Sequence, residues 1–232
     1  MYRDNTVSVV IPCYNEEKGI AMVIRSLPSS VDEVVVVDNN STDRTAEVAR
    51  GLGARVVFEK RKGYGAAYQA GLPAVTGSLT VTMDGDGTYP VEQIEECIDH
   101  LLDKRLDFVS ASRFPLKDPK AMNFSNKVGN AVLTWATLIL FMRGIRDSQS
   151  GMWIFRSAVY PMLHPRSDGM PFSEEIKINA IRHPEVRFDE YHVNYHPRVG
   201  EVKLEKWRDG IRNLLFLVKL RMTPFERNAG RP

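Results

Sequence analysis

Short runs of apolar residues alternate with amphipathic stretches along the first half of the chain. Runs rich in valine and isoleucine, such as TVSVVIP and EVVVVD, are typical of buried strands, whereas apolar residues repeated every three or four positions predict helices. Strands are therefore predicted at residues 6–12, 33–38, 54–58, 78–83 and 106–110. Helices are predicted between them at residues 16–27, 43–52, 63–74 and 90–102.

This alternation predicts the architecture. Strands joined by helices through short loops form a parallel sheet with helices on both of its faces. We therefore expect a single α/β domain of Rossmann-like type with a mostly parallel central sheet. Sheets of this type bind ligands at the carboxyl ends of their strands, so the residues that follow each strand are the first candidates for a site.

The second half of the chain is less regular. Its pattern predicts helices at residues 123–142, 172–182 and 204–222, and strands at residues 151–155 and 186–195. The sequence contains no internal repeat, no low-complexity segment and no stretch typical of an interdomain linker. The best interpretation is one domain that spans residues 1–232.

Composition narrows the class of protein. Of 232 residues, 31 are Lys or Arg and 29 are Asp or Glu, a balance that argues against a nucleic-acid-binding protein built on a large positive field. The hydrophobic fraction of 43% is sufficient for a packed core. Cys13 and Cys97 belong to no disulfide framework or zinc motif, which is typical of a cytoplasmic protein.

No stretch of the sequence is long enough to cross a membrane, since the longest apolar run, residues 131–142, falls short of the roughly 20 residues that a spanning helix needs. Residues 203–232 nevertheless carry eight basic and three acidic residues among apolar ones. A basic amphipathic helix of this kind suits an anionic membrane surface, and it is equally typical of a helix that packs on the core with a solvated basic face. We expect a protein that is peripheral at the cytoplasmic face of a membrane.

The strongest chemical signal is Asp84-Gly85-Asp86-Gly87, directly after the predicted strand at residues 78–83. Two carboxylates two residues apart supply hard oxygen ligands, which suit Mg²⁺ or Mn²⁺ sharing its coordination shell with phosphate oxygens. The glycines let the backbone turn tightly and leave room for a bulky ligand. On this motif alone, an acidic turn without a metal is the alternative interpretation.

Three further strand ends carry weaker signals. Tyr14 and Glu16 follow the first strand, where an aromatic ring can stack on a base and a carboxylate can hold a ribose. Asp38 ends the second strand, where it can hydrogen-bond a nucleotide, and the Ser41-Thr42-Asp43 that follows is also a helix cap. The basic residues 60–62, placed before glycines at a helix start, suit a diphosphate.

In this order, the motifs IPCYNEE, VVVDNNSTD, KGYGAA and DGDGTYP resemble those of the family-2 glycosyltransferases of GT-A fold. The resemblance continues through SRF at residues 112–114, DSQSG at 147–151, FSEE at 172–175 and RVGEVKL at 198–204. These later motifs resemble the polyprenyl-phosphate sugar transferases, including dolichol-phosphate mannosyltransferases and the related glucosyltransferases. The resemblance covers roughly residues 6–215.

The resemblance implies a nucleotide-sugar donor, GDP-mannose or UDP-glucose, and a metal, Mg²⁺ or Mn²⁺, on Asp84 and Asp86. It also implies a nucleotide-sugar-binding half at residues 1–113 and an acceptor-binding half at residues 114–232. Asn39 departs from the family, which often has an acid there, and Thr88 replaces a Gln of many lipid-phosphate members, so a third protein ligand to the metal stays open. The expected donor-binding residues are Pro12, Tyr14, Glu16, Asp38, Asn39, Lys62 and Asp84.

A sugar transferase must stabilise a departing nucleoside diphosphate, and a metal ion helped by Arg or Lys does so. Arg113, Arg198 and Lys203 are the candidates for this help and for binding an acceptor phosphate. Glu175 is the best candidate for a general base by its position in the family. The expected catalytic residues are Asp86, Glu175, Arg198 and Arg113.

The acceptor decides whether a base is needed. A phosphate monoester is already largely dianionic at about pH 7, so it requires cations more than deprotonation. The leading hypothesis is an inverting transfer of a hexose to a polyprenyl phosphate at a membrane surface. The alternatives are transfer to a soluble or protein-bound hydroxyl with Glu175 as general base, a nucleotide-binding protein without catalysis, and a sugar nucleotidyltransferase, whose Gly-rich basic loop is missing after the first strand. We expect no nucleic-acid partner, and a homo-oligomer is compatible with the sequence.

Overall fold

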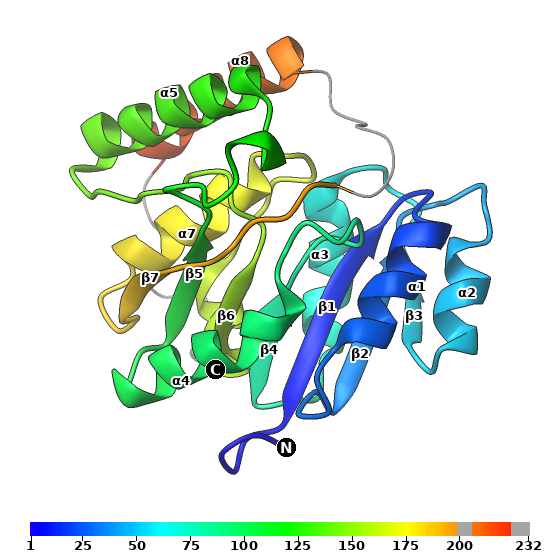
Figure 1. Cartoon of the computed structure of the whole chain (residues 1–232). Helices are drawn as coiled ribbons and strands as arrows, with labels where there is room; N and C mark the ends of the chain where they lie inside the picture. Colours follow the sequence, from blue (N-terminus) through cyan, green and yellow to red (C-terminus); the bar gives the residue numbers. More distant parts are fainter. Residues whose placement is uncertain (199–205, 224–232) are drawn as a thin grey trace.

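The structure is a computed structural model that describes residues 1–198 and 206–223. At its centre is a seven-stranded sheet with the strand order β3-β2-β1-β4-β6-β5-β7 (Figure 1). This confirms the predicted α/β fold with a mostly parallel sheet. The strands are β1 (Val7–Cys13), β2 (Glu33–Asp38), β3 (Arg55–Phe58), β4 (Leu79–Thr82), β5 (Phe108–Ser112), β6 (Trp153–Arg156) and β7 (Phe188–His192).

Strand direction determines where the strand-end motifs meet. β1 is parallel to both of its neighbours, so that Val9 is level with Val34 of β2 on one side and with Val81 of β4 on the other. β6 is the exception, because it runs antiparallel to both β4 and β5. The carboxyl ends of β1, β2 and β4 therefore lie at one edge of the sheet.

Helices cover both faces of the sheet, as the alternation of strands and helices predicts. α1 (Glu17–Ser26), α2 (Thr45–Gly51) and α4 (Ile94–Asp103) pack on one face, whereas α3 (Tyr64–Gly71), α6 (Tyr160–Leu163) and α7 (Phe172–Arg182) pack on the other. β1 contributes side chains to the cores on both faces, because successive side chains of a strand point to opposite faces. Val9 and Ile11 belong to the first core and Val10 to the second.

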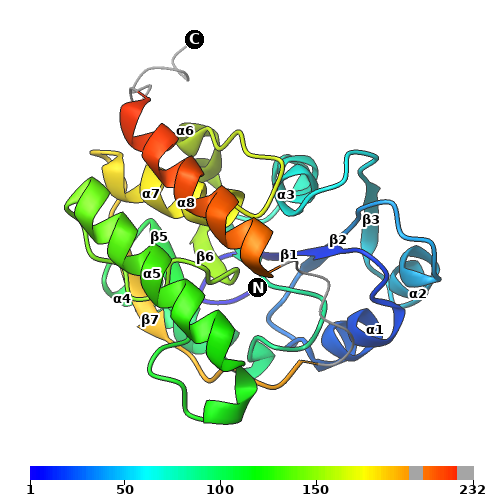
Figure 2. The same ribbon diagram turned by 90° about the horizontal axis from the view of Figure 1, so that it is seen from above.

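Two long helices form a further layer. α5 (Phe124–Phe141) and α8 (Lys206–Met222) lie side by side above the edge to which β1 points (Figures 1 and 2). A small cluster of Leu133, Leu217 and Leu220 with Ile178 joins them to α7. Neither these two helices nor any other within residues 1–198 and 206–223 is both long and apolar enough to pass through a membrane.

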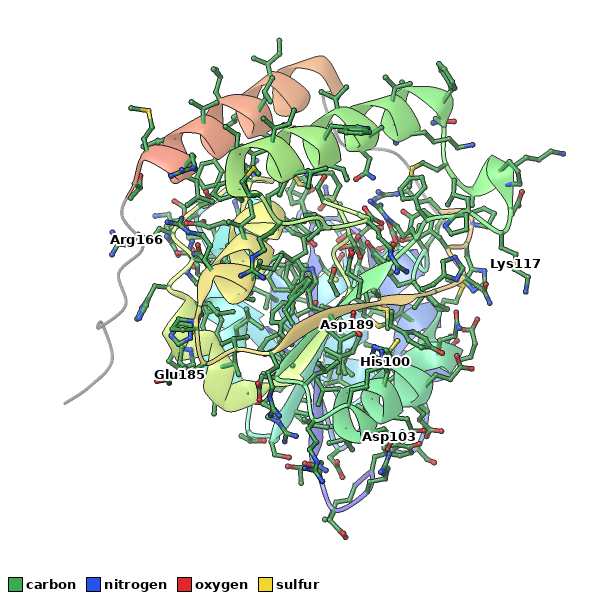
Figure 3. The ribbon with its side chains drawn as sticks, turned by 90° about the vertical axis from the view of Figure 1, so that its left-hand side faces the viewer. His100, Asp103, Lys117, Arg166, Glu185 and Asp189 are labelled. Carbon is green, nitrogen blue, oxygen red and sulfur yellow. The ribbon has the colours of Figure 1, made fainter. Side chains whose placement is uncertain are left out.

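β7 positions the segment that returns to the sheet edge. It is held to α4 by Asp189, whose Oδ2 lies 2.9 Å from His100 Nε2 and 3.0 Å from Lys104 Nζ (Figure 3). After β7 the backbone continues along the sheet edge, where the Val193 N–H donates to the Ser112 carbonyl and the His196 N–H to the Thr88 carbonyl, both at 2.9 Å. This path brings the residues that follow His196 to the acidic loop after β4.

The predicted helices are present, with shifted ends. The third helix ends at Gly71 and continues as a 3₁₀ turn, Leu72–Ala74, because Pro73 has no backbone N–H to donate. The fourth opens with a 3₁₀ turn, Val91–Gln93, ahead of α4.

The second helix begins at Thr45, later than predicted, and of the expected capping residues it is Asp43 whose Oδ1 accepts the Thr45 N–H at 3.0 Å. The last strand is confined to residues 188–192 of the predicted 186–195. The fifth strand is displaced by two residues, because the Leu106 N–H closes the end of α4 by donating to the Leu101 carbonyl at 2.7 Å. No sequence pattern had predicted α6 or the 3₁₀ turns Pro119–Ala121 and Ser157–Val159.

Gly19 on α1 faces the acidic loop directly. A Cβ atom at this position would lie 2.4 Å from the carbonyl oxygen of Gly85 and 3.3 Å from the Cα atom of Asp86. The helix therefore approaches the loop so closely that a methyl group does not fit between the two backbones.

We expect Gly19→Ala to lower the free energy of unfolding by about 1–3 kcal/mol, because the added methyl displaces the loop that carries Asp86. The measurement is urea or thermal unfolding. Gly51→Ala is the matched control, since a Cβ atom there meets nothing within 4 Å, and it should leave the fold unchanged or up to about 1 kcal/mol more stable. Equal effects of the two substitutions would contradict the close packing of α1 on the loop.

Candidate active site

Two cavities meet at the carboxyl end of β4. The first has a volume of about 350 Å³ and the second a volume of about 380 Å³. Both are lined by Tyr64, Asp84, Asp86, Met170 and Arg198. Ligands in the two cavities would therefore face each other across the acidic pair.

The first cavity brings together most of the predicted donor-binding residues. Pro12, Tyr14 and Glu16 come from the end of β1, Asn39 comes from the end of β2, and Lys62 precedes α3. Lys62 Nζ lies 5.3 Å from the centre of the Tyr14 ring, which is a cation–π distance. An aromatic ring and a cation thus stand together in this cavity, a combination that suits a nucleotide.

Asp38 and Asn39 have different positions. Asp38 is buried, its Oδ1 accepts the Ser41 N–H at 3.0 Å, and it is absent from the described lining of the first cavity. Asn39 Nδ2 donates to the carbonyls of Glu59 and Arg61, while its Oδ1 accepts the Gly63 N–H at 2.9 Å. This explains the amide in place of an acid, because a carboxylate could not donate to two carbonyls. Asn39 thereby holds the loop that presents Lys62.

The acidic pair is oriented by its own surroundings. Asp86 is buried, and its Oδ1 accepts both the N–H of Thr88, at 3.0 Å, and the hydroxyl of Thr88, at 2.7 Å. Asp84 is half-buried, with its Oδ1 3.4 Å from the hydroxyl of Tyr64. Gly87 has a φ of 74°, a conformation that favours glycine and that closes the turn after Asp86. Thr88 therefore fixes the orientation of the Asp86 carboxylate.

Arg198 connects the acidic pair to the first cavity. Its Nη2 donates to Glu16 Oε1 at 2.7 Å, and its Nη1 lies 3.1 Å from Asp86 Oδ2. Burial, followed by the charge of Asp86, raises the pKa of Asp84 to about 7, although Arg113 and Arg198 act in the opposite direction. A second negative charge beside Asp86 is therefore unfavourable at Asp84, where both cavities open.

The pair of acids at this place fits a divalent cation. Two carboxylates supply hard oxygen ligands, and a cation between them would relieve the repulsion that raises the pKa of Asp84. The structure within residues 1–198 and 206–223 has no cluster of three or more His, Cys, Asp and Glu side chains that could hold a metal by itself. A cation here would complete its shell with water and with the phosphate oxygens of a ligand.

Arg113 lines the second cavity and is held by a buried ion pair. Its Nε and Nη2 donate to the two carboxylate oxygens of Asp147 at 2.6 and 2.8 Å, and its guanidinium lies 5.2 Å from the centre of the Tyr195 ring. Burial alone would raise the pKa of Asp147, but the charge and hydrogen bonds of Arg113 hold it below its ordinary value. The pair fixes the orientation of the Arg113 guanidinium.

A fully buried lysine holds the loop that carries Asp147. Lys177 Nζ on α7 donates to the carbonyls of Asp147, Ser148 and Ser150 at 3.0, 2.5 and 3.1 Å. Burial lowers the pKa of Lys177 to about 8, even though Asp147 favours the charged form. The ammonium group thus clamps the loop that carries the partner of Arg113.

Glu175 is hydrogen-bonded to the backbone of the loop before α7. Its Oε2 accepts the Ser167 N–H at 2.8 Å, and it is not among the described residues that line either cavity. The preceding Glu174 is fully buried, and its Oε1 accepts from Gln149 Nε2 at 2.6 Å. Gln149 in turn lines the second cavity. Lys203 lies outside the described residues.

Sequence reasoning missed several residues that build this site. Tyr64 and Met170 line both cavities, and Tyr195 packs on Arg113. Asp147 and Lys177 hold the arginine, yet no spacing rule connects positions that are distant in the chain. The only signal was that Asp147 opens the DSQSG segment, to which no role had been given.

Comparisons with known proteins found matches over most of the chain. The model of the glycosyl transferase family 2 matches residues 8–160. A dolichyl-phosphate hexose transferase of Haloferax volcanii is 34% identical over 217 residues, which are 90% of this chain and 91% of that protein. The low-salt glycan biosynthesis hexosyltransferase Agl6 of the same organism is 33% identical over 220 residues, or 92% of this chain and 53% of that protein. The chain thus spans about half the length of Agl6.

Solved structures show the same fold. A glucosyl-3-phosphoglycerate synthase from Mycobacterium tuberculosis, in complex with Mn²⁺, UDP-glucose and phosphoglyceric acid, is similar with a TM-score of 0.74 at 23% identity. The similarity covers 95% of this chain and 81% of that one. The architecture predicted from the strand and helix pattern is thus shared with a GT-A glycosyltransferase.

Glu174 makes the stability of the fold sensitive to pH. Burial raises the pKa of this carboxyl from its ordinary 4.5 to about 8, with Lys177 and Gln149 acting in the opposite direction. Between these two values the unfolded chain loses a proton that the folded chain keeps, so the contribution of Glu174 to stability falls as the pH rises. Below about pH 4 both states hold the proton, and the difference disappears.

We therefore expect Glu174→Gln to be more stable than the wild type at about pH 8, by about 1–3 kcal/mol, and to lose this advantage at about pH 5. Thermal unfolding across this pH range measures the difference. Glu185→Gln, an exposed position just beyond the same helix, removes the same charge and serves as the control. A difference between Glu174→Gln and the wild type that does not change with pH would show that Glu174 is ionised throughout.

Proposed function

The chain belongs to glycosyl transferase family 2, and from that premise we propose that it transfers a hexose from GDP-mannose or UDP-glucose to a polyprenyl phosphate, with inversion at the sugar. The name of the dolichyl-phosphate hexose transferase that it resembles over 90% of its length supports this acceptor class. The proposal requires a donor site and an acceptor site that meet at the reacting bond.

One observation carries the proposal. The second cavity contains cations that could bind an acceptor, but it contains no described side chain besides the acidic pair that could act as a general base. Arg113, Arg198 and Lys120 line it, whereas Asp84 and Asp86 are its only carboxylates among the residues that the structure describes. A hydroxyl acceptor would need a base besides these metal-binding acids, and Glu175 does not line the cavity. A phosphate acceptor is already anionic and needs only positioning by cations.

The donor would occupy the first cavity. Tyr14 and Lys62 would hold the nucleotide and its diphosphate, and the sugar would lie near the acidic pair. Arg198, which pairs with Glu16 and Asp86, is placed to turn its charge toward the phosphates of the donor or of the acceptor. Asp38 would act on the nucleotide only indirectly, because it accepts the Ser41 N–H, and the Ser41 hydroxyl accepts the N–H of Asn15 next to Tyr14.

In the transfer step, an oxygen of the acceptor phosphate forms a bond to the anomeric carbon while the bond from this carbon to the diphosphate breaks. The nucleoside diphosphate leaves with the electron pair, and no proton has to be removed. Asp84 and Asp86 would hold a divalent cation, Mg²⁺ or Mn²⁺, which would supply Lewis acidity to the leaving diphosphate. Arg113, fixed by Asp147, and Arg198 hold the attacking phosphate in line.

The two halves of the chain divide this work. Residues 1–113 supply the lining of the first cavity except for Met170 and Arg198, whereas residues 114–232 supply most of the lining of the second. Met170 and Arg198 are thus the two residues by which the second half of the chain contributes to the lining of the first cavity. The division supports the proposal of a nucleotide-sugar-binding half and an acceptor-binding half.

We expect Asp86→Asn to lower kcat by at least about 100-fold, because it removes a ligand charge that stabilises the leaving group. The asparagine keeps an oxygen that can accept from Thr88, so the fold should be preserved. The measurement is release of nucleoside diphosphate from the donor in the presence of Mn²⁺ and a detergent-solubilised polyprenyl phosphate. Asp103→Asn, an exposed acid on α4, is the matched control. Full activity of Asp86→Asn, or of the wild type in excess chelator, would exclude a role for the metal.

The choice of acceptor has its own test. We expect Arg198→Ala to reduce kcat/KM for a polyprenyl phosphate more than Glu175→Gln does, by about 10-fold or more, since a charge-assisted contact is lost in a secluded site. Arg198→Lys should recover part of the loss. If Glu175→Gln is the more damaging change and polyprenyl phosphates are not glycosylated, the acceptor is a hydroxyl.

A further inference from the structure

The helices α5 and α8 are apolar on two opposite sides. Their inner sides pack on Ile178 of α7 through Leu133, Leu217 and Leu220. Their outer sides expose further large apolar side chains to solvent, although the outer side of a surface helix is usually polar. On α5 these are Phe124, Val128, Val132, Trp135, Leu138, Ile139 and, just beyond its end, Met142; on α8 they are Ile211, Leu214, Leu215, Val218 and Met222.

The exposed residues form one continuous face. On each helix they recur at intervals of three and four positions, so they lie on one side of the helix, opposite the buried residues. Because both inner sides pack on α7, both outer sides point away from the sheet. The two helices lie side by side as the outermost layer of the molecule (Figures 1 and 2). We call this surface the α5–α8 face.

The segments that form the α5–α8 face and its ends are rich in basic residues. Residues 117–146 and 210–223 contain a single acid, Asp118, although the whole chain has a net charge of only +2. The basic residues of these segments are Lys117, Lys120, Lys127, Arg143, Arg146, Arg212, Lys219 and Arg221.

We propose that the α5–α8 face docks on an anionic lipid bilayer, with both helices lying in the plane of the interface. Apolar side chains would enter the region between headgroups and acyl chains, Trp135 would sit at the boundary, and the surrounding Lys and Arg would meet lipid phosphates. A second copy of the chain is the less suitable occupant, because it would bring two positively charged rims together.

The second cavity connects this face to the acidic pair. Gly129 and Leu133 of α5 and Gly210 and Asn213 of α8 line one part of it, and Asp84 and Asp86 line another. A lipid whose phosphate reaches Arg113 would therefore have its hydrocarbon chain directed between the two helices and toward the bilayer. This link to the acceptor rests on the proposed function, whereas the docking itself does not.

The test is flotation of the whole chain with vesicles that contain no polyprenyl phosphate and no donor. We expect binding to vesicles of phosphatidylcholine with about one third phosphatidylglycerol, and at least tenfold weaker binding of Trp135→Glu. Trp135 is 64% exposed, so the substitution should not disturb the core. Phe58→Glu is the matched control, because Phe58 on β3 is 60% exposed and lies at the opposite edge of the sheet from β7. It should bind as the wild type does.

A second variant separates the charges from the apolar contact. Lys219→Gln should weaken binding to the anionic vesicles by about fivefold, the effect of one basic residue near such a surface, without changing the melting temperature. Binding of the wild type should fall in vesicles of phosphatidylcholine alone and at high salt.

The proposal is overturned if the wild type does not float with anionic vesicles, or if Trp135→Glu and Phe58→Glu bind equally. It is also overturned if sedimentation velocity shows a dimer that Trp135→Glu dissociates, since the face would then bind a second copy. Transfer to a polyprenyl phosphate in detergent reports separately on the proposed function. Transfer without vesicle binding removes only the docking surface, whereas vesicle binding without transfer removes only the acceptor.

Discussion

The two carboxylates after β4 impose the constraint on which the rest of the site depends. Asp84 and Asp86 lie at the meeting point of two cavities, and burial together with their mutual repulsion raises the pKa of Asp84. Charges of one sign can stay together in a secluded place only if cations and hydrogen-bond donors surround them. Thr88 and Arg198 supply this for Asp86, and the glycine on α1 allows the loop to sit directly on the helix.

A second set of buried charges gives the acceptor side its rigidity. Arg113 is bound by both oxygens of Asp147, and Lys177 holds the carbonyls of the loop on which Asp147 lies. Removing one member would leave the others charged without a partner, which is far more unfavourable than replacing the whole set. Such a set is therefore better suited to fixing the direction of one guanidinium than to adding stability. The arrangement joins β5, the loop before β6 and α7 into one support for the second cavity.

The helices α5 and α8 of the outer layer carry apolar residues on two opposite sides. Leu133 and Leu217 attach α5 and α8 to α7, while Trp135 and Leu215 on the same helices remain exposed. Burying both apolar sides of such a helix is more favourable than burying one. Since the second cavity runs beneath these helices, whatever covers their outer side lies close to the entrance for the acceptor.

The sequence by itself determined the strands, the longer helices and the edge of the sheet where the site lies. Buried strands such as β2 are nearly continuous apolar runs. The acid that ends β2 and the acids that follow β4 lie near one another because parallel strands end at one edge. Only the tertiary structure decided which partner each predicted site residue has. Asn39 holds the loop at Lys62, Glu175 accepts from the backbone of Ser167, and Arg113 pairs with Asp147. The physical reason is that local spacing determines on which side of an element a residue lies, whereas its partner there comes from a distant segment brought close by packing.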